Sequence, residues 1–168
     1  MDNQNKLSKE KDMTTLVGTQ KDFADALKEL CELDYDAIEA YKTAIKRLDN
    51  PLYISKLTEF MGDHERHTDE ISQLLAKHSV KIPEGPSMKK FLTQGKVVLA
   101  DLMGDDTILK AMQSNEVDTN TAYERLNKHE GKWTDSVQIL ERGLADERRH
   151  KAWIDAQLSQ KGTFRKAA

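Results

Sequence analysis

The sequence predicts an all-α protein: a four-helix bundle with up-down-down-up connectivity and an internal pseudo-two-fold. Three observations support this fold class. Apolar residues recur at alternating spacings of three and four over four long segments, which is the period of amphipathic helices. Polar motifs of the first half recur in the second half, and the central connection is much longer than the two outer ones.

Two polar motifs occur twice at a nearly constant offset. The pattern Asp-x-x-Arg-His spans residues 63–67 and again residues 146–150. Upstream of each copy, an acidic residue is followed seven positions later by a tyrosine; these pairs are Asp34 with Tyr41 and Glu116 with Tyr123. The offset is 82 residues for the tyrosines and 83 for the Asp-x-x-Arg-His motifs. We infer that a two-helix unit occurs twice.

The first helical segment covers residues 27–48 and has Asp34 among its core-facing positions. The second covers residues 51–77. It begins at Asn50-Pro51, because Asn caps helix N-termini and Pro is favoured at the first helical position. Both histidines of the first Asp-x-x-Arg-His motif face inward on this helix.

The third helical segment follows Gly104-Asp105-Asp106 and extends to about residue 126, with Glu116 facing the core. After a break near residues 128–132, the fourth segment places Glu147 and His150 at core-facing positions. The second half therefore repeats the layout of the first.

The central connection contains the run from Ile82 to Pro86, whose two prolines and one glycine mark it as a loop after the second helix. A short amphipathic helix, capped by Ser87, is predicted from there to about Met103. This length allows the chain to return along a whole helix, so the second and third helices run parallel. The short turns inside each half make their helices antiparallel.

Composition sets the domain limits and excludes some partners. We expect a disordered N-terminal segment over residues 1–18, one domain over residues 19–160 and a frayed tail over residues 161–168. The net charge is −3 with interspersed signs, so no basic surface for nucleic acid is expected. No segment is apolar enough to cross a membrane, and the single Cys31 is consistent with a reducing cytoplasm.

Six ionisable residues occupy core-facing positions of the four helices: Asp34, His64, His67, Glu116, Glu147 and His150. On the second and fourth helices they form i, i+3 pairs, so both members of each pair can reach the bundle axis. A buried charge without a partner costs several kcal/mol. A divalent cation would compensate these groups, because carboxylates and imidazoles are suitable ligands for such ions.

These residues resemble the pattern of the ferritin-like carboxylate-bridged di-metal proteins, in which two helices each provide a Glu and two each provide Glu-x-x-His. Residues 146–150 look like the Asp-Glu-x-Arg-His signature of the oxygen-activating members, and Glu116 with Tyr123 resembles the acid-plus-tyrosine helix of bacterioferritins and rubrerythrins. The similarity covers about residues 20–160 and is closest to bacterial ferritin-like proteins. It implies a ferritin-like bundle with one or two divalent ions, iron first and manganese or zinc as alternatives.

The resemblance also implies a role for each residue. Glu147 would bridge two metals, with Asp34 and Glu116 as terminal ligands. His67 and His150 would bind one metal each. The surrounding residues would hold these ligands in place: Asp63 and Asp146 as acceptors for ring N–H groups, with Arg66 and Arg149 as their ion-pair partners. Apart from the resemblance, we expect Tyr41 and Tyr123 to be buried phenols that donate to a carboxylate.

His64 departs from the family pattern, because it stands where the family has its second bridging Glu. A neutral imidazole adds no negative charge and cannot bridge two ions as a carboxylate does. Three outcomes remain open: a mononuclear site, an asymmetric pair completed by hydroxide, Glu65 or Asp63, or a metal-free polar core.

The sequence therefore supports two functions of different classes. The first is a metal-binding protein. With an open metal position it would be a non-haem oxidoreductase acting on dioxygen or peroxide, of unspecified substrate. The second is a non-enzymatic, stress-related or interaction module, for example a homodimer, in which the inward polar residues only fix helix register.

Overall fold

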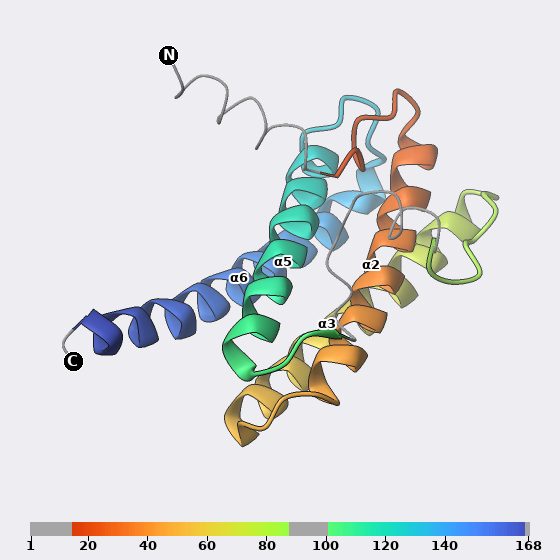
Figure 1. Ribbon diagram of the computed structural model, residues 1–168. Helices are drawn as coiled ribbons and strands as arrows, with labels where there is room; N and C mark the ends of the chain where they lie inside the picture. Colours follow the sequence, from red (N-terminus) through yellow and green to blue (C-terminus); the bar gives the residue numbers. More distant parts are fainter. Residues whose placement is uncertain (1–14, 88–100, 167–168) are drawn as a thin grey trace, which may run out of the picture.

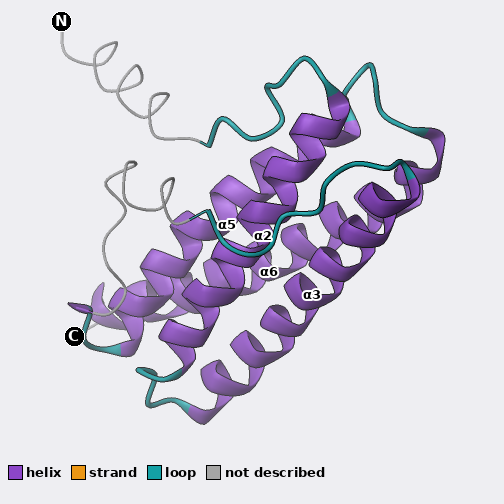
Figure 2. Cartoon of the chain, turned by 90° about the vertical axis from the view of Figure 1, so that its right-hand side faces the viewer, coloured by secondary structure: helices purple, strands orange, loops and turns teal. Residues whose placement is uncertain are grey.

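The computed structural model describes residues 15–87 and 101–166, and within them four long helices form a bundle (Figure 1). They are α2 (Phe23–Ile45), α3 (Pro51–Lys77), α5 (Asp105–Asn127) and α6 (Val137–Lys166), with the short 3-10 helix η2 (Thr134–Ser136) before α6. No strand occurs in this part of the chain (Figure 2). The predicted all-α four-helix bundle is confirmed. The short helix expected in the central connection falls mainly on residues 88–100, outside the described residues.

The start of α3 follows the predicted cap. The side chain of Asn50 accepts a hydrogen bond from the backbone N–H of Leu52 at 2.9 Å, and Pro51 is the first helical residue. Asp105, at the start of α5, accepts from the backbone N–H groups of Asp49 and Asn50 at 2.9 and 3.1 Å. The turn between α2 and α3 is thereby fixed to the beginning of the second half.

The helix directions give up-down-down-up connectivity. Short turns make α2 antiparallel to α3, and α5 antiparallel to α6. Across the halves, Tyr41 lies beside Glu116 and Tyr123 lies beside Asp34, so α2 and α5 are also antiparallel. Consequently α3 and α5 run parallel, as the long central connection predicts.

Two apolar clusters at opposite ends of the bundle enclose a polar layer. One cluster includes Leu30, Ile71, Leu126 and Leu140, and the other includes Leu57, Phe60, Leu109 and Ile154. Each helix turns one apolar face inward and a polar face outward, the pattern of helices that pack around a shared core. None of the helices in the described ranges is long and apolar enough to cross a bilayer.

The segment before α2 packs against the bundle. Thr15 and Val17, within the N-terminal segment expected to be disordered, are 3% and 2% exposed. Their carbonyl oxygens accept hydrogen bonds from Arg125, and the Thr15 N–H donates to Asp118 at 3.1 Å. This segment forms a turn and not a helix, so it has no helical periodicity from which its packing could be predicted. At the other end, α6 continues to Lys166, into the tail expected to fray.

Candidate metal centre

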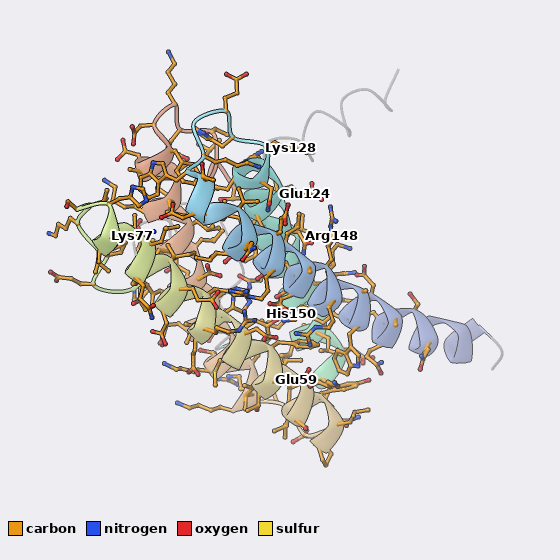
Figure 3. The ribbon with its side chains drawn as sticks, turned by 180° about the vertical axis from the view of Figure 1, so that it is seen from behind. Glu59, Lys77, Glu124, Lys128, Arg148 and His150 are labelled. Atoms are coloured by element: carbon orange, nitrogen blue, oxygen red, sulfur yellow. The ribbon has the colours of Figure 1, made fainter. Side chains whose placement is uncertain are left out.

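The six ionisable residues singled out from the sequence lie together in the middle of the bundle. They come from all four helices: Asp34 from α2, His64 and His67 from α3, Glu116 from α5, and Glu147 and His150 from α6. Five of them are completely buried and His67 is 2% exposed. Figure 3 shows His150 between α6 and α3, whereas the labelled Glu124 and Arg148 lie on the outside of the bundle.

The six residues form two overlapping groups, each with the geometry to hold a metal ion. In each group, one ligand atom from every residue lies within 4.8 Å of those from the others. The first group contains Asp34 and His67, and the second contains Glu116 and His150. Both groups share His64 and Glu147.

The two tyrosines connect the halves of the bundle at this layer. The Tyr41 hydroxyl donates to Glu116 Oε1 at 2.5 Å, and the Tyr123 hydroxyl donates to Asp34 Oδ2 at 2.8 Å. Burial, together with the adjacent carboxylates, raises the pKa of both phenols well above the usual value. Both tyrosines therefore remain protonated donors at neutral pH.

The outer nitrogens of two histidines face carboxylates. His67 Nε2 lies 3.2 Å from Asp146 Oδ2, and His150 Nε2 lies 2.9 Å from Asp63 Oδ2. Because each aspartate can accept the N–H of its ring, it orients the imidazole so that Nδ1 faces the bundle axis. The sequence predicted these two aspartates as the acceptors.

Two arginines pair with both aspartates, which makes a four-residue ion-pair network across α3 and α6. Arg66 lies 3.0 Å from Asp63 and 2.6 Å from Asp146, and Arg149 lies 2.5 and 3.2 Å from the same two residues. Burial alone would raise the pKa of Asp146, but hydrogen bonds from His67, Arg66 and Arg149 outweigh it and hold the pKa well below the usual value. Each aspartate thus stays ionised.

Asp146→Asn is expected to lower the free energy of unfolding by about 2 kcal/mol, because one carboxylate accepts from three charged or imidazole donors. The pKa of Asp146 is lower in the folded state. Its contribution is therefore present above about pH 4 and is lost as the pH falls through the folded value. Urea unfolding between pH 5 and pH 2 should show the difference between wild type and variant shrinking with acid.

Glu124→Gln is the matched control, because Glu124 is 44% exposed and makes a single 3.3 Å contact with Arg148. Its effect should stay below about 0.5 kcal/mol. An equal loss in both variants would show that the network around Asp146 has no special role.

Several buried atoms of the polar layer have no hydrogen-bond partner. They are His64 Nε2, His67 Nδ1, Glu116 Oε2, both Glu147 oxygens and His150 Nδ1. Buried polar atoms in folded proteins are nearly always hydrogen-bonded, and each exception calls for an explanation. Carboxylate oxygens and imidazole nitrogens are the types of atom that bind divalent metals once they are deprotonated.

The electrostatics of the layer separate its carboxylates. Burial, reinforced by Glu116 and Asp34, raises the pKa of Glu147 to about 8. Burial would also raise the pKa of Asp34, but the hydrogen bond from His64 and the nearby His67 ring, 3.5 Å away, lower it below the usual value. Burial would lower the pKa of His67, but its bond to Asp146 and the nearby Asp34 carboxylate raise it to about 10. Glu147 is therefore the carboxylate with the least compensation.

Sequence reasoning missed two residues that shape the site. The Asn120 amide donates to the backbone oxygens of Glu116 and Glu147 at 2.8 and 2.9 Å, which joins α5 to α6. The Phe60 ring stacks on His150 with centroids 4.3 Å apart. Neither residue has a counterpart of the same type in the other half, so the duplication could not reveal them. For Asn120, the available signal was its position one helical turn after Glu116.

Comparison with known proteins gives one family. A model described as "Domain of unknown function (DUF2383)" matches residues 22–129. The match covers α2, α3 and α5 and includes four of the six residues of the polar layer, whereas Glu147 and His150 lie beyond it. No curated protein and no solved structure matches the chain significantly.

Proposed function

The chain belongs to the DUF2383 family, a domain of unknown function, and we propose that it is a ferritin-like metalloprotein that binds a divalent ion inside its bundle. Iron is the preferred ion, with manganese and zinc as alternatives. When bound with an open coordination position, iron supplies oxidase or peroxidase chemistry on dioxygen or peroxide.

The unpartnered atoms of the polar layer carry this proposal. Glu147 is completely buried and neither of its oxygens has a hydrogen-bond partner. Leaving such a group unsatisfied costs on the order of 1–3 kcal/mol, and more when it is charged. A divalent cation removes that cost, because it binds the carboxylates and the inward imidazole nitrogens together.

The residues around the layer fit a metal. Carboxylate and imidazole ligands suit Fe(II), Mn(II) and Zn(II). Asp63 accepts from the outer nitrogen of His150, the arrangement that fixes the tautomer of metal-binding histidines. The Tyr41 hydroxyl occupies only one oxygen of Glu116 and leaves Oε2 for the ion. The two apolar clusters exclude water on either side.

Metal analysis tests the proposal. Protein purified without chelators should contain bound metal, and Glu147→Ala should reduce the metal content to background, because it removes the carboxylate shared by both groups. His78→Ala is the control, since His78 is partly exposed beside Asp135, at the far end of α3. Equally negligible metal in all three proteins would contradict the proposal.

The competing interpretation is a polar layer that fixes helix register without metal. It has one specific support: Tyr123, Asp34 and His64 already form a hydrogen-bonded chain at 2.8 Å per step. Thermal unfolding separates the two. A ligand that binds only the folded state raises the melting temperature, whereas a register-fixing layer leaves it unchanged on addition of Fe(II), Mn(II) or Zn(II).

Metal binding should release a proton below pH 8. The pKa of Glu147 is about 8 without metal, so at lower pH the ion must displace the proton of this carboxyl group. The apparent affinity should therefore weaken by at least about tenfold per pH unit below pH 8, because the raised pKa of His64 adds a second proton that the ion must displace. Calorimetric titrations at pH 7, in buffers of different ionisation enthalpy, would measure the number of protons released on metal binding. A metal affinity that does not change between pH 6 and 8 would contradict the expectation.

A further inference from the structure

We propose that the bundle binds one ion, not two, through His64 Nε2, Glu116, Glu147 and His150, and that Asp34 is a positioning residue for His64. This inference rests on the proposed metal-binding function. It departs from the sequence-based assignment, in which Asp34 and His67 are also ligands. The argument depends on which donor atoms of the polar layer are already engaged.

Both carboxylate oxygens of Asp34 already have partners. Oδ1 lies 2.8 Å from His64 Nδ1, and Oδ2 accepts from the Tyr123 hydroxyl at 2.8 Å. Glu116, the matching acid of the second half, differs: Tyr41 donates to Oε1, and Oε2 has no partner. The two acids of the pseudo-two-fold are therefore not equivalent.

The contact with Asp34 sets the proton position on His64. An ionised carboxylate only accepts, so in the neutral ring, the form that binds a metal, the proton lies on Nδ1 and the lone pair on Nε2. That Nε2 is buried and has no hydrogen-bond partner. A carboxylate bound to one ring nitrogen while the other faces an ion is the usual way in which proteins orient a metal-binding histidine.

The free donor atoms therefore gather in the second group. This group consists of His64, Glu116, Glu147 and His150. Its atoms without a hydrogen-bond partner are His64 Nε2, Glu116 Oε2, both Glu147 oxygens and His150 Nδ1. Two imidazoles and two carboxylates match the charge of one divalent ion. In the first group, Asp34 and His64 Nδ1 are engaged with each other. Only His67 and the shared Glu147 remain there, which is too few for a second ion.

The pseudo-two-fold offers matched variants for the test. His67 and His150 are both buried, and each lies within hydrogen-bond distance of an aspartate through Nε2. Anaerobic titration with Co(II), followed by visible absorption and metal analysis, should give one ion per wild-type chain. His150→Ala should weaken binding at least about 100-fold, and His67→Ala less than about tenfold, still with one ion per chain.

A second pair of variants, Asp34→Asn and Glu116→Gln, tests whether Asp34 is a positioning residue or a ligand. In Asp34→Asn the amide oxygen still accepts from His64, so the stoichiometry and the Co(II) spectrum should persist with about tenfold weaker binding. Glu116→Gln removes a ligand charge and should weaken binding at least about 100-fold. Circular dichroism of the metal-free variants identifies any that do not fold, and His150→Gln replaces His150→Ala in that case.

The outcomes separate this inference from the proposed function. Two ions per wild-type chain, or equal loss in His67→Ala and His150→Ala, would overturn the single-ion site and leave a metalloprotein. A spectrum abolished by Asp34→Asn would make Asp34 a ligand and overturn its positioning role. No Co(II) binding by wild type would overturn both the inference and the proposed function.

Discussion

Gly143→Ala is expected to lower the free energy of unfolding by about 3 kcal/mol, because a Cβ at this position has no room. An added Cβ would lie 2.3 Å from Tyr123 Cε1 and 3.0 Å from two further atoms of the same ring. Tyr123 is 1% exposed and its hydroxyl is bonded to Asp34, so the ring cannot move aside without breaking that bond. Urea unfolding of the metal-free protein measures the effect.

Gly62→Ala is the matched control for this substitution. Gly62 is also helical, in α3, but an added Cβ there has no atom within 4 Å. Alanine favours the helix over glycine, so this variant should be more stable by about 0.5–1 kcal/mol. If the two variants had the same stability, close packing of α6 against Tyr123 could not be the reason for glycine at residue 143.

Glu147→Met is expected to stabilise the metal-free protein by about 1–3 kcal/mol and to abolish metal binding. Both Glu147 oxygens are buried without hydrogen-bond partners, so the substitution leaves no strong hydrogen bond broken. Methionine has a similar shape and fills the space without an unsatisfied polar atom. Stability at the expense of function is the expected pattern for a binding residue.

The measurement is urea unfolding at pH 7 with chelator, and again with added Zn(II). The exposed Glu141 of α6 provides the control, since Glu141→Met should change stability by less than about 0.5 kcal/mol. A Glu147→Met variant that is less stable than wild type without metal would show that Glu147 holds the bundle together by itself.

The internal duplication, together with helical periodicity, made both the architecture and the six residues of the polar layer predictable from the sequence. The duplicated motifs place Asp34 and Glu116, and likewise His67 and His150, at matching levels of antiparallel helices. Helical periodicity then directs them inward. Helix caps such as Asn50-Pro51 are local signals and could also be predicted.

Features that depend on the packing of one half against the other could not be predicted. Gly143 accommodates Tyr123, and Phe60 stacks on His150, although the sequence has no matching pair in the other half. The engagement of Asp34 by His64 is also invisible in sequence, because it depends on which oxygen meets which nitrogen. In the proposed single-ion site, that contact is the reason why Asp34 is a positioning residue and not a ligand.

The most direct test of a metal site inside the bundle is anomalous diffraction from crystals grown with Zn(II), recorded on both sides of the zinc absorption edge. The account predicts one strong peak per chain, about 2.0–2.2 Å from a Glu147 oxygen and from nitrogens of His64 and His150. A bundle interior without any peak, with zinc only at surface carboxylates, would contradict it.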